Sequence, residues 1–484
     1  MGEFIATINA LVWGSQSIPY PPVLLLLLGV GLYLTVRLGF MPILKIPYAF
    51  GQLSKGRKSD DEGDVSPFGA LMTALSSTIG TGNIAGVAVA IAIGGPGAVF
   101  WMWMTALVGM ASKFAEGVLA VKFREVDADG RHVGGPMYYI KNGIGPQWAW
   151  LGAIFAGFGV LASWGTGASI QANSIADAVN QSYGIAPWLT GAVLAAGAAA
   201  VILGGIKRIA AVASRLVPFM AASYLLAGLI VVGLNADAVP AAFGAIITNA
   251  FGYDAAAGGF VGGLLLLAMQ RGVARGVFSN EAGQGSAPIA HAAAKNNDPV
   301  NQGIIAMLGT FIDTIIVCSI TAFVILTAGI IGSECAPFVR ESLVSLPAGC
   351  ETGAPLTVAA FEQSLPGLGS HIVAIGLTVF GFTTILGWSY YGERCAEYLF
   401  SEKIIVPFRV SWIVMTFLGA VALMAEEGGA VTDIVSFLWL IADTLTGLMA
   451  APNLIALLVL SPLVAKLTKE YFAKEKRAAA SGSA

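Results

Sequence analysis

Eleven long apolar stretches follow one another along this chain and constrain its fold more than any other feature. Most reach the roughly 20 residues that a helix needs to cross the apolar core of a bilayer. They do not alternate with period two, which favours helices over the strands of a membrane β-barrel. The stretches lie at residues 17–37, 66–94, 96–122, 148–180, 187–206, 213–234, 257–285, 300–332, 370–393, 405–424 and 431–463. The sequence therefore predicts an all-α polytopic membrane protein with eleven transmembrane helices.

Charged residues make up only 11% of the 484 and gather between these stretches. Soluble domains carry roughly a quarter, so a soluble enzyme is excluded, and a net charge of -3 provides no basic face for nucleic acid. Lys and Arg concentrate after the odd-numbered stretches, and Arg340 is the exception in a loop after an even one. Because cytoplasmic loops are enriched in basic residues, we expect a multi-pass protein of the plasma (inner) membrane. Its N-terminus would lie outside and its C-terminus in the cytoplasm.

Two of the stretches are interrupted by polar residues and glycines. The second carries hydroxyls, glycines and Asn83 across residues 76–86, and the seventh carries a polar segment across residues 270–285. Each interrupted stretch opens a block of five, and the two blocks have opposite orientations, which predicts a 5+5 inverted repeat with a broken first helix in each half. Paired interruptions of this kind indicate the binding site of a secondary transporter. The alternative is that the glycines only allow helices to pack closely.

This reading divides the chain into five parts. They are an extra N-terminal helix with a cytoplasmic linker (1–65), a first repeat (66–235), an external connector (236–256), a second repeat (257–463) and a basic cytoplasmic tail (464–484).

A broken helix exposes N–H groups that attract a carboxylate and C=O groups that attract a small cation. The glycine-rich break would leave room for a small substrate, with Trp388, Phe382 and Trp164 as possible walls. A hydroxyl pair in the ninth stretch would complete a cation site. The expected substrate-binding residues are Thr78, Ile79, Gly80, Thr81, Gly82, Asn83, Gln171, Gly272, Gly276 and Trp388, and the expected Na⁺ ligands are Ser76, Ser77, Ile79, Thr383 and Thr384.

Several ionisable residues also fall within the stretches, and intramembrane charges suggest function. Lys113 and Glu116, three residues apart, are expected to form an ion pair. Asp313 is equally compatible with cation or proton coupling and with a structural role, and Glu281 with a cytoplasmic gate or an ion pair with Arg271 or Arg275. Cys335 and Cys350 flank one external loop and are a candidate disulfide. No set of residues suggests a metal other than Na⁺.

Long motifs in the chain resemble the alanine/glycine:cation symporter family. They lie at residues 67–71, 76–86, 94–103, 113–116, 276–283 and 387–393, and the resemblance extends over nearly the whole chain. It implies the amino acid–polyamine–organocation fold and Na⁺-coupled, in some cases H⁺-coupled, uptake of alanine, glycine and similar amino acids. Segment 80–83 is similar to the carboxylate-binding break of that fold, and residues 383–384 to the hydroxyl pair of its sodium site.

We therefore expect a symporter, acting as a monomer in the lipid bilayer, that binds a small neutral amino acid and uses Na⁺ as the coupling ion, with H⁺ possible. Three other hypotheses remain open. The same fold could carry another small solute or use protons, the protein could be an intramembrane enzyme, or it could be a channel. An enzyme is disfavoured because no His lies where it could join a nucleophile–base pair.

Overall fold

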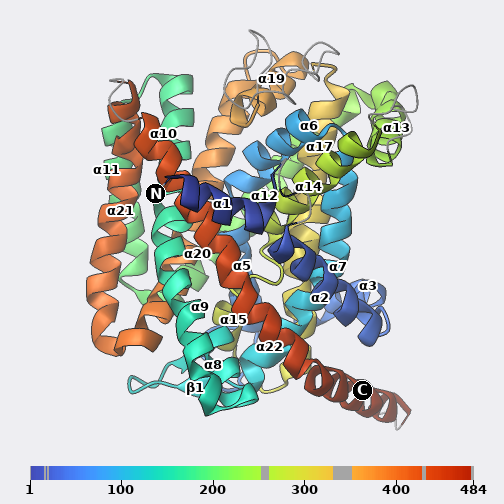
Figure 1. The fold of residues 1–484 in the computed structure, drawn as a ribbon, viewed down its shortest axis with the longest axis vertical. Helices are drawn as coiled ribbons and strands as arrows, with labels where there is room; N and C mark the ends of the chain where they lie inside the picture. Colours follow the sequence, from blue (N-terminus) through green and yellow to red (C-terminus); the bar gives the residue numbers. More distant parts are fainter. Residues whose placement is uncertain are drawn as a thin grey trace.

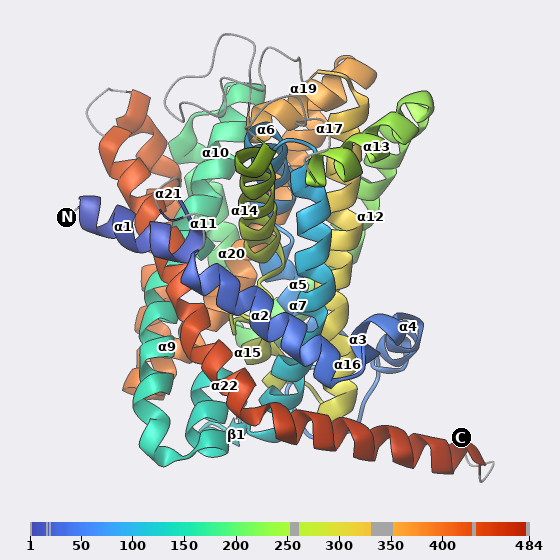
Figure 2. The same cartoon turned by 45° about the vertical axis from the view of Figure 1, so that its right-hand side comes forward.

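The computed structural model describes residues 2–15, 18, 21–251, 261–330, 352–427 and 432–480. Within these residues the fold is a helical bundle, and its one sheet is the short antiparallel hairpin of β1 (Glu125–Val126) and β2 (His132–Val133). Figure 1 and Figure 2 show the long helices running roughly vertically, with the hairpin at the lower end and α13 and α19 at the upper end.

The first half of the chain forms the following elements: α1 (Gly2–Trp13), α2 (Pro22–Arg37), α3 (Met41–Leu44), α4 (Ile46–Lys55), α5 (Pro67–Thr78), η1 (Gly82–Gly86), α6 (Val87–Gly94), α7 (Gly97–Lys122), α8 (Pro136–Tyr139), η2 (Ile140–Ile144), η3 (Pro146–Trp148), α9 (Ala149–Ala162), η4 (Ser163–Ser169), α10 (Ile170–Tyr183), α11 (Pro187–Ile202), α12 (Gly205–Leu234), η5 (Ala236–Ala238) and α13 (Val239–Ala250).

The second half forms α14 (Val261–Asn280), α15 (Ala287–Ala292), α16 (Pro299–Thr310), η7 (Phe311–Cys318), α17 (Ser319–Thr327), α19 (Ala354–Ser364), α20 (Gly369–Phe400), η8 (Glu402–Ile404), α21 (Ile405–Glu427) and α22 (Thr432–Ala480).

Most of the predicted membrane spans are present as long apolar helices. Among the described residues, seven helices are long and apolar enough to cross a membrane, and a bent pair within 67–94 makes an eighth. Two further predicted spans, α2 and α11, are apolar helices of 16 residues each, and α14 covers the seventh predicted stretch from residue 261. The all-α membrane architecture is confirmed, while the count of eleven spans and the inverted repeat stay predictions.

The first predicted helix break is present. Helix α5 ends at Thr78, the second half begins at Gly82, and the two halves are bent by 56°. The hydroxyls of Ser76, Ser77 and Thr78 donate to carbonyls three or four residues earlier. Serine and threonine hydroxyls in an apolar helix commonly find a hydrogen-bond acceptor in this way, in the preceding turn.

The second break lies later than the sequence suggested. Helix α14 continues through the polar residues from 270 and ends at Asn280, and the unwound segment covers residues 281–286 before α15. Glu281, Gly283 and Gly285 have φ angles of 53°, 82° and 85°. Three left-handed residues within five positions cannot continue a right-handed helix, so the chain turns here.

Helix α7 packs against both α14 and α16 through glycines that admit no side chain. A Cβ atom on Gly117 would lie 2.7 Å from the Cβ of Ala306, and one on Gly303 would lie 2.7 Å from the carbonyl oxygen of Phe114. We call these two residues, together with Gly272 and Gly276 of α14, the glycine seam. At each of them the neighbouring helix lies too close to admit a Cβ atom.

The lower end of the bundle, which the charge pattern predicts to be cytoplasmic, carries a network of ion pairs. Buried Arg394 lies 2.5 Å from carboxylate oxygens of both Glu393 and Glu397, and Arg409 pairs with Glu393 at 2.6 Å. In the adjoining hairpin, burial acts to raise the pKa of Asp127, but hydrogen bonds and the charge of Arg131 outweigh it and hold that pKa below its usual value. This network ties α20 to α21 and to the hairpin.

Candidate functional site

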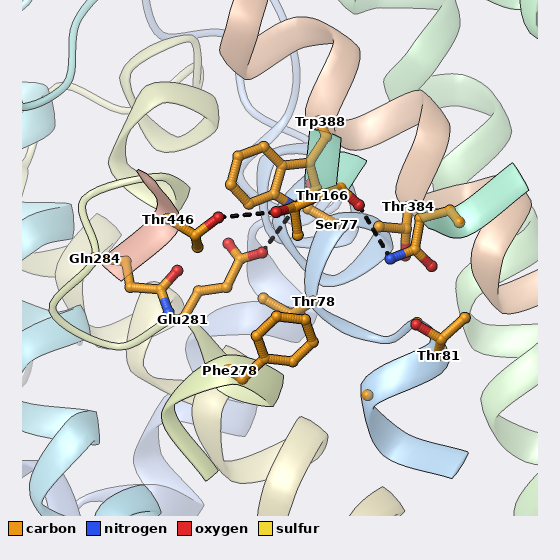
Figure 3. Close-up of a pocket in the computed structure, with 13 residues that line it drawn as sticks. Ser77, Thr78, Thr81, Thr166, Phe278, Glu281, Gln284, Thr384, Trp388 and Thr446 are labelled. Carbon is orange, nitrogen blue, oxygen red and sulfur yellow. Dashed lines mark hydrogen bonds between the residues drawn. The ribbon is translucent and has the colours of Figure 1, made fainter. Parts of the chain in front are cut away.

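A polar pocket lies between the two breaks, near the middle of the bundle (Figure 3). Its empty space, counted together with solvent at its open side, is about 320 Å³. Its walls come from the first break, η4 and α10, the end of α14 with its unwound segment, α20 and α22. The lining residues are Ser77, Thr78, Gly80, Thr81, Gly82, Thr166, Gln171, Phe278, Glu281, Gln284, Thr384, Trp388 and Thr446.

The first break presents backbone amides to this pocket. The amide of Gly80 is taken up by the side-chain oxygen of Asn83 at 2.9 Å, and the amide of Asn83 by the carbonyl of Gly80 at 3.3 Å. The first N–H groups of a helix lack partners within the helix, which leaves the amides of Thr81 and Gly82 as the candidate donors to a ligand carboxylate.

Asn83 itself is turned away from the pocket. Its side-chain amide donates to a carboxylate oxygen of Asp313 at 2.7 Å, and Ser279 and Thr314 donate to the other oxygen at 2.8 and 2.7 Å. Both Asn83 and Asp313 are fully buried. These bonds connect the first break to the end of α14 and to η7, so the structure gives Asn83 a bracing position instead of a lining one.

One hydroxyl of the predicted pair reaches the first break. Thr384 places its Oγ1 3.4 Å from the carbonyl oxygen of Ile79 and donates to Phe380 at 3.0 Å. Thr383 donates to the carbonyl of Phe380 at 2.9 Å and lies 3.5 Å from the sulfur of Met220, away from the break. A carbonyl and a hydroxyl at this separation supply the hard oxygen ligands that a small cation prefers.

Helix α20 also lies directly on the carbonyl end of α5. A Cβ on Gly387 would fall 2.1 Å from the hydroxyl of Ser77 and 2.8 Å from that of Ser76. The predicted cation-binding residues of the two helices are therefore brought together, with Thr383 as the exception.

The opposite wall contains Glu281, which the sequence did not assign to the pocket, and Thr166 and Thr446, which it did not single out. Glu281 accepts hydrogen bonds from the indole N–H of Trp388 at 2.9 Å and from the hydroxyl of Ser286. Thr166 and Thr446 lie 2.9 Å apart through their hydroxyls. Trp388, a predicted wall residue, is thus fixed by Glu281, which does not pair with Arg271 or Arg275 within the described residues.

The other predicted wall residues divide between the pocket and the packing around it. Gln171 lines the pocket; its amide donates to the carbonyl of Thr166 at 3.2 Å, while its side-chain oxygen has no partner among the described residues. Trp164 stacks on Phe408, and Phe382 lies against Gly197. Neither of these two aromatic residues is among the described lining residues.

Gly272 and Gly276 are not brought to the pocket. A Cβ on Gly272 would lie 2.2 Å from the carbonyl oxygen of Ala98, and one on Gly276 would lie 2.2 Å from the hydroxyl of Thr105. Both face α7 in the glycine seam because α14 stays helical through this region. Their small size serves packing.

We expect Gly272→Ala to lower the amount of folded protein without changing its affinity for substrate. A backbone carbonyl cannot rotate away from the new methyl group, and overpacking costs about 1–3 kcal/mol or more. Fluorescence-detected size exclusion after heating measures the loss, with Gly157→Ala as control because nothing lies within 4 Å of that position. Full expression with weakened substrate binding would return Gly272 to the binding site.

Lys113 and Glu116 do not form the expected ion pair. The Nζ atom of Lys113 is buried and has no hydrogen-bond partner among the described residues. Glu116 instead accepts from the side-chain amide of Asn453 at 2.7 Å and from the amide of Gly285 at 3.1 Å. The carboxylate of Glu116 therefore holds the second break in place.

The predicted disulfide between Cys335 and Cys350 lies outside the described residues. Cys318 and Cys395 are buried free thiols. Within the described residues, no group of three or more His, Cys, Asp or Glu side chains is placed to hold a metal ion.

A bundle of membrane-spanning helices around a small, buried polar pocket with a broken helix is the architecture of a membrane transporter. A structural neighbour is a manganese transporter variant from Eremococcus coleocola, with a TM-score of 0.53 at 13% identity over 83% of this chain and 85% of that one. This likeness concerns the fold.

The sequence comparisons identify the family. The model of the sodium:alanine symporter family matches residues 1–483. The chain is 48% identical to the sodium/alanine symporter AgcS of Methanococcus maripaludis, over 97% of both chains. It is 39% identical to a putative sodium/proton-dependent alanine carrier of Bacillus subtilis, over 99% of this chain and 94% of the other, and 35% identical to a probable sodium/glutamine symporter of the same organism, over 98% and 91%. This protein belongs to the sodium:alanine symporter family and is a multi-pass membrane transporter, not an enzyme.

Proposed function

We propose that this protein uses the inward movement of Na⁺ to drive uptake of small neutral amino acids, with alanine and glycine as substrates, by alternating access. Family membership supports a sodium-coupled amino-acid symporter. The observation that carries the finer proposal is the pocket between the two breaks, where candidate carboxylate donors and candidate cation ligands come from the same unwound segment.

In this proposal the substrate carboxylate is received by the amides of Thr81 and Gly82, at the positive end of the second half-helix. Na⁺ is held by the carbonyl of Ile79, the hydroxyl of Thr384 and neighbouring carbonyls of Ser76 and Ser77. Because both ligands contact the same short segment, the bound cation would order the break for the substrate. Gln171 and Trp388 would limit the length of the substrate side chain.

The membrane arrangement belongs to the same proposal. Eleven spans with a 5+5 inverted repeat would place the N-terminus on the outer side of the inner membrane and the basic C-terminal tail on its cytoplasmic side. The working unit would be the monomer. Rocking of one bundle against the other around the pocket would expose it to each side in turn.

The proposal is tested by counterflow of labelled alanine into proteoliposomes of the purified protein, in Na⁺ and in choline. We expect exchange in Na⁺ alone, with competition by unlabelled alanine and glycine and weaker competition by glutamine, since each extra methylene costs about 1–3 kcal/mol in a closed pocket. Exchange in choline that responds to a pH gradient would favour proton coupling, which the name of the putative sodium/proton-dependent alanine carrier of Bacillus subtilis suggests for that protein. Absence of alanine exchange under both conditions would reject the proposal.

A further inference from the structure

One ionisable side chain stands in the pocket wall. Of the thirteen described residues that line the pocket, Glu281 alone has an acidic or basic side chain. The residue is 3% exposed, and its side chain lies across the pocket from Thr81 (Figure 3). A carboxyl group at the protein surface would be far more exposed, so solvation by bulk water does not explain why an acidic residue occupies this position.

The backbone at Glu281 adopts an uncommon conformation to place the side chain here. Glu281 has a φ of 53°, which is uncommon for a residue other than glycine. Backbone strain of this kind persists where the surrounding structure enforces it, and it is concentrated at functional sites. The left-handed residue ends α14 and turns the carboxylate toward the pocket.

The hydrogen bonds of Glu281 orient its carboxyl group and come from neutral donors. Trp388 donates its indole N–H to Oε1, and Ser286 donates its hydroxyl to Oε2. An indole can only donate, so Oε1 acts as an acceptor. Each carboxylate oxygen has further acceptor capacity, which is available to a donor inside the pocket.

No described cation neutralises Glu281 directly. Within the described residues no Lys, Arg or His nitrogen lies within 4.0 Å of its carboxylate. Buried Lys113 acts on Glu281 electrostatically from a distance, and the other acids in the region, Glu116 and Asp313, are bound by their own amide and hydroxyl donors. A buried carboxylate without a direct counter-ion is costly, and a cationic ligand group would remove that cost.

The pocket therefore offers opposite electrostatic features on facing walls. The start of the second half-helix at Thr81 and Gly82 attracts negative charge, and Glu281 attracts positive charge. An α-amino acid carries both charges on a single carbon atom. Resting on the proposed function, we infer that Glu281 receives the ammonium group of the substrate, so that the site selects ligands with a free α-amino group over 2-hydroxy acids of the same size.

The first test uses the unmodified protein. Alanine and lactate differ only in the ammonium and hydroxyl groups, and a charge-assisted hydrogen bond accounts for about 10- to 100-fold in affinity. We expect lactate to compete with labelled alanine at least about tenfold more weakly than alanine itself. Equal competition by lactate would overturn the inference.

The second test uses Glu281→Gln, which keeps the size and the acceptor for Trp388 but removes the charge. We expect the alanine concentration for half-maximal competition to rise about 10- to 100-fold, while lactate changes by less than about threefold, so that the preference collapses. Glu281→Asp, which retains the charge on a shorter side chain, is expected to keep the preference. If the variant no longer transports, the ratio of its affinities for alanine and lactate is measured from ligand-induced shifts in its melting temperature.

Glu397→Gln is the matched control. It also removes a buried acidic side chain, but Glu397 belongs to the ion-pair network at the lower end of the bundle and is not among the described lining residues. It should leave the alanine-to-lactate ratio unchanged even if the protein becomes less stable. An unchanged ratio in Glu281→Gln rejects the inference alone, whereas a wild-type protein without Na⁺-dependent alanine exchange rejects the proposed function.

Discussion

Replacing Gly80 by alanine is expected to reduce alanine uptake at physiological Na⁺ to background. A Cβ at this position would lie 2.6 Å from the Oγ1 of Thr384, well inside ordinary van der Waals contact. The hydroxyl would have to turn away, and in doing so it would leave the carbonyl oxygen of Ile79 that it now approaches to 3.4 Å. The proposed cation site would lose its geometry, so the Na⁺ requirement should rise at least about tenfold.

The measurement is alanine counterflow as a function of Na⁺ concentration, normalised to folded protein. Gly86→Ala is the control on the same half-helix, because nothing lies within 4 Å of its added carbon. Combining Gly80→Ala with Thr384→Ala should be no worse than Thr384→Ala alone, since the second change removes the clash. A Gly80→Ala protein with wild-type Na⁺ dependence would show that this contact has no part in cation binding.

Replacing Thr384 by valine should raise the half-saturating Na⁺ concentration by about tenfold or more, while the isosteric change at Thr383 should alter it less than about twofold. Valine keeps the shape of threonine and removes one oxygen. Only the hydroxyl of Thr384 reaches the first break, whereas that of Thr383 is directed to Phe380 and Met220. Even residues that only hydrogen-bond to the ligands of a metal account for about 10- to 100-fold in metal affinity.

Both valine variants are compared in the same Na⁺ titration, with melting temperature as a check on folding. Equal effects of the two changes would mean that the helix rotates between states and brings both hydroxyls to the ion. No effect of either would place the cation elsewhere, and the buried carboxylate of Asp313 would then be the next residue to substitute.

The sequence predicted the first break because its signal is local. Glycines and hydroxyl residues at 76–86 interrupt an apolar stretch, and the break follows from those residues alone. The second break was placed too broadly, because polar residues from 270 onward look like an interruption while their backbone stays helical. Packing on α7 explains Gly272 and Gly276, and that contact depends on a helix far away in the sequence.

The place of Glu281 in the pocket wall could not be predicted from the sequence for a related reason. Its position depends on a left-handed backbone, on Ser286 and on Trp388, which lies 107 residues further along the chain. Thr166 and Thr446, which meet across 280 residues, were equally hidden among the hydroxyls of apolar helices. The run of glycines around Glu281 was the available signal for an unusual backbone at this point.

The glycine seam has a practical consequence for following the transport cycle. Close contacts at these glycines leave no free space between the helices, so α7, α14 and α16 should keep their spacing as the protein changes shape. Pairs of spectroscopic labels on α7 and α16 would supply a fixed frame of reference. Displacements of α20, α21 and α22 measured against that frame would separate true domain motion from tumbling and from local label dynamics.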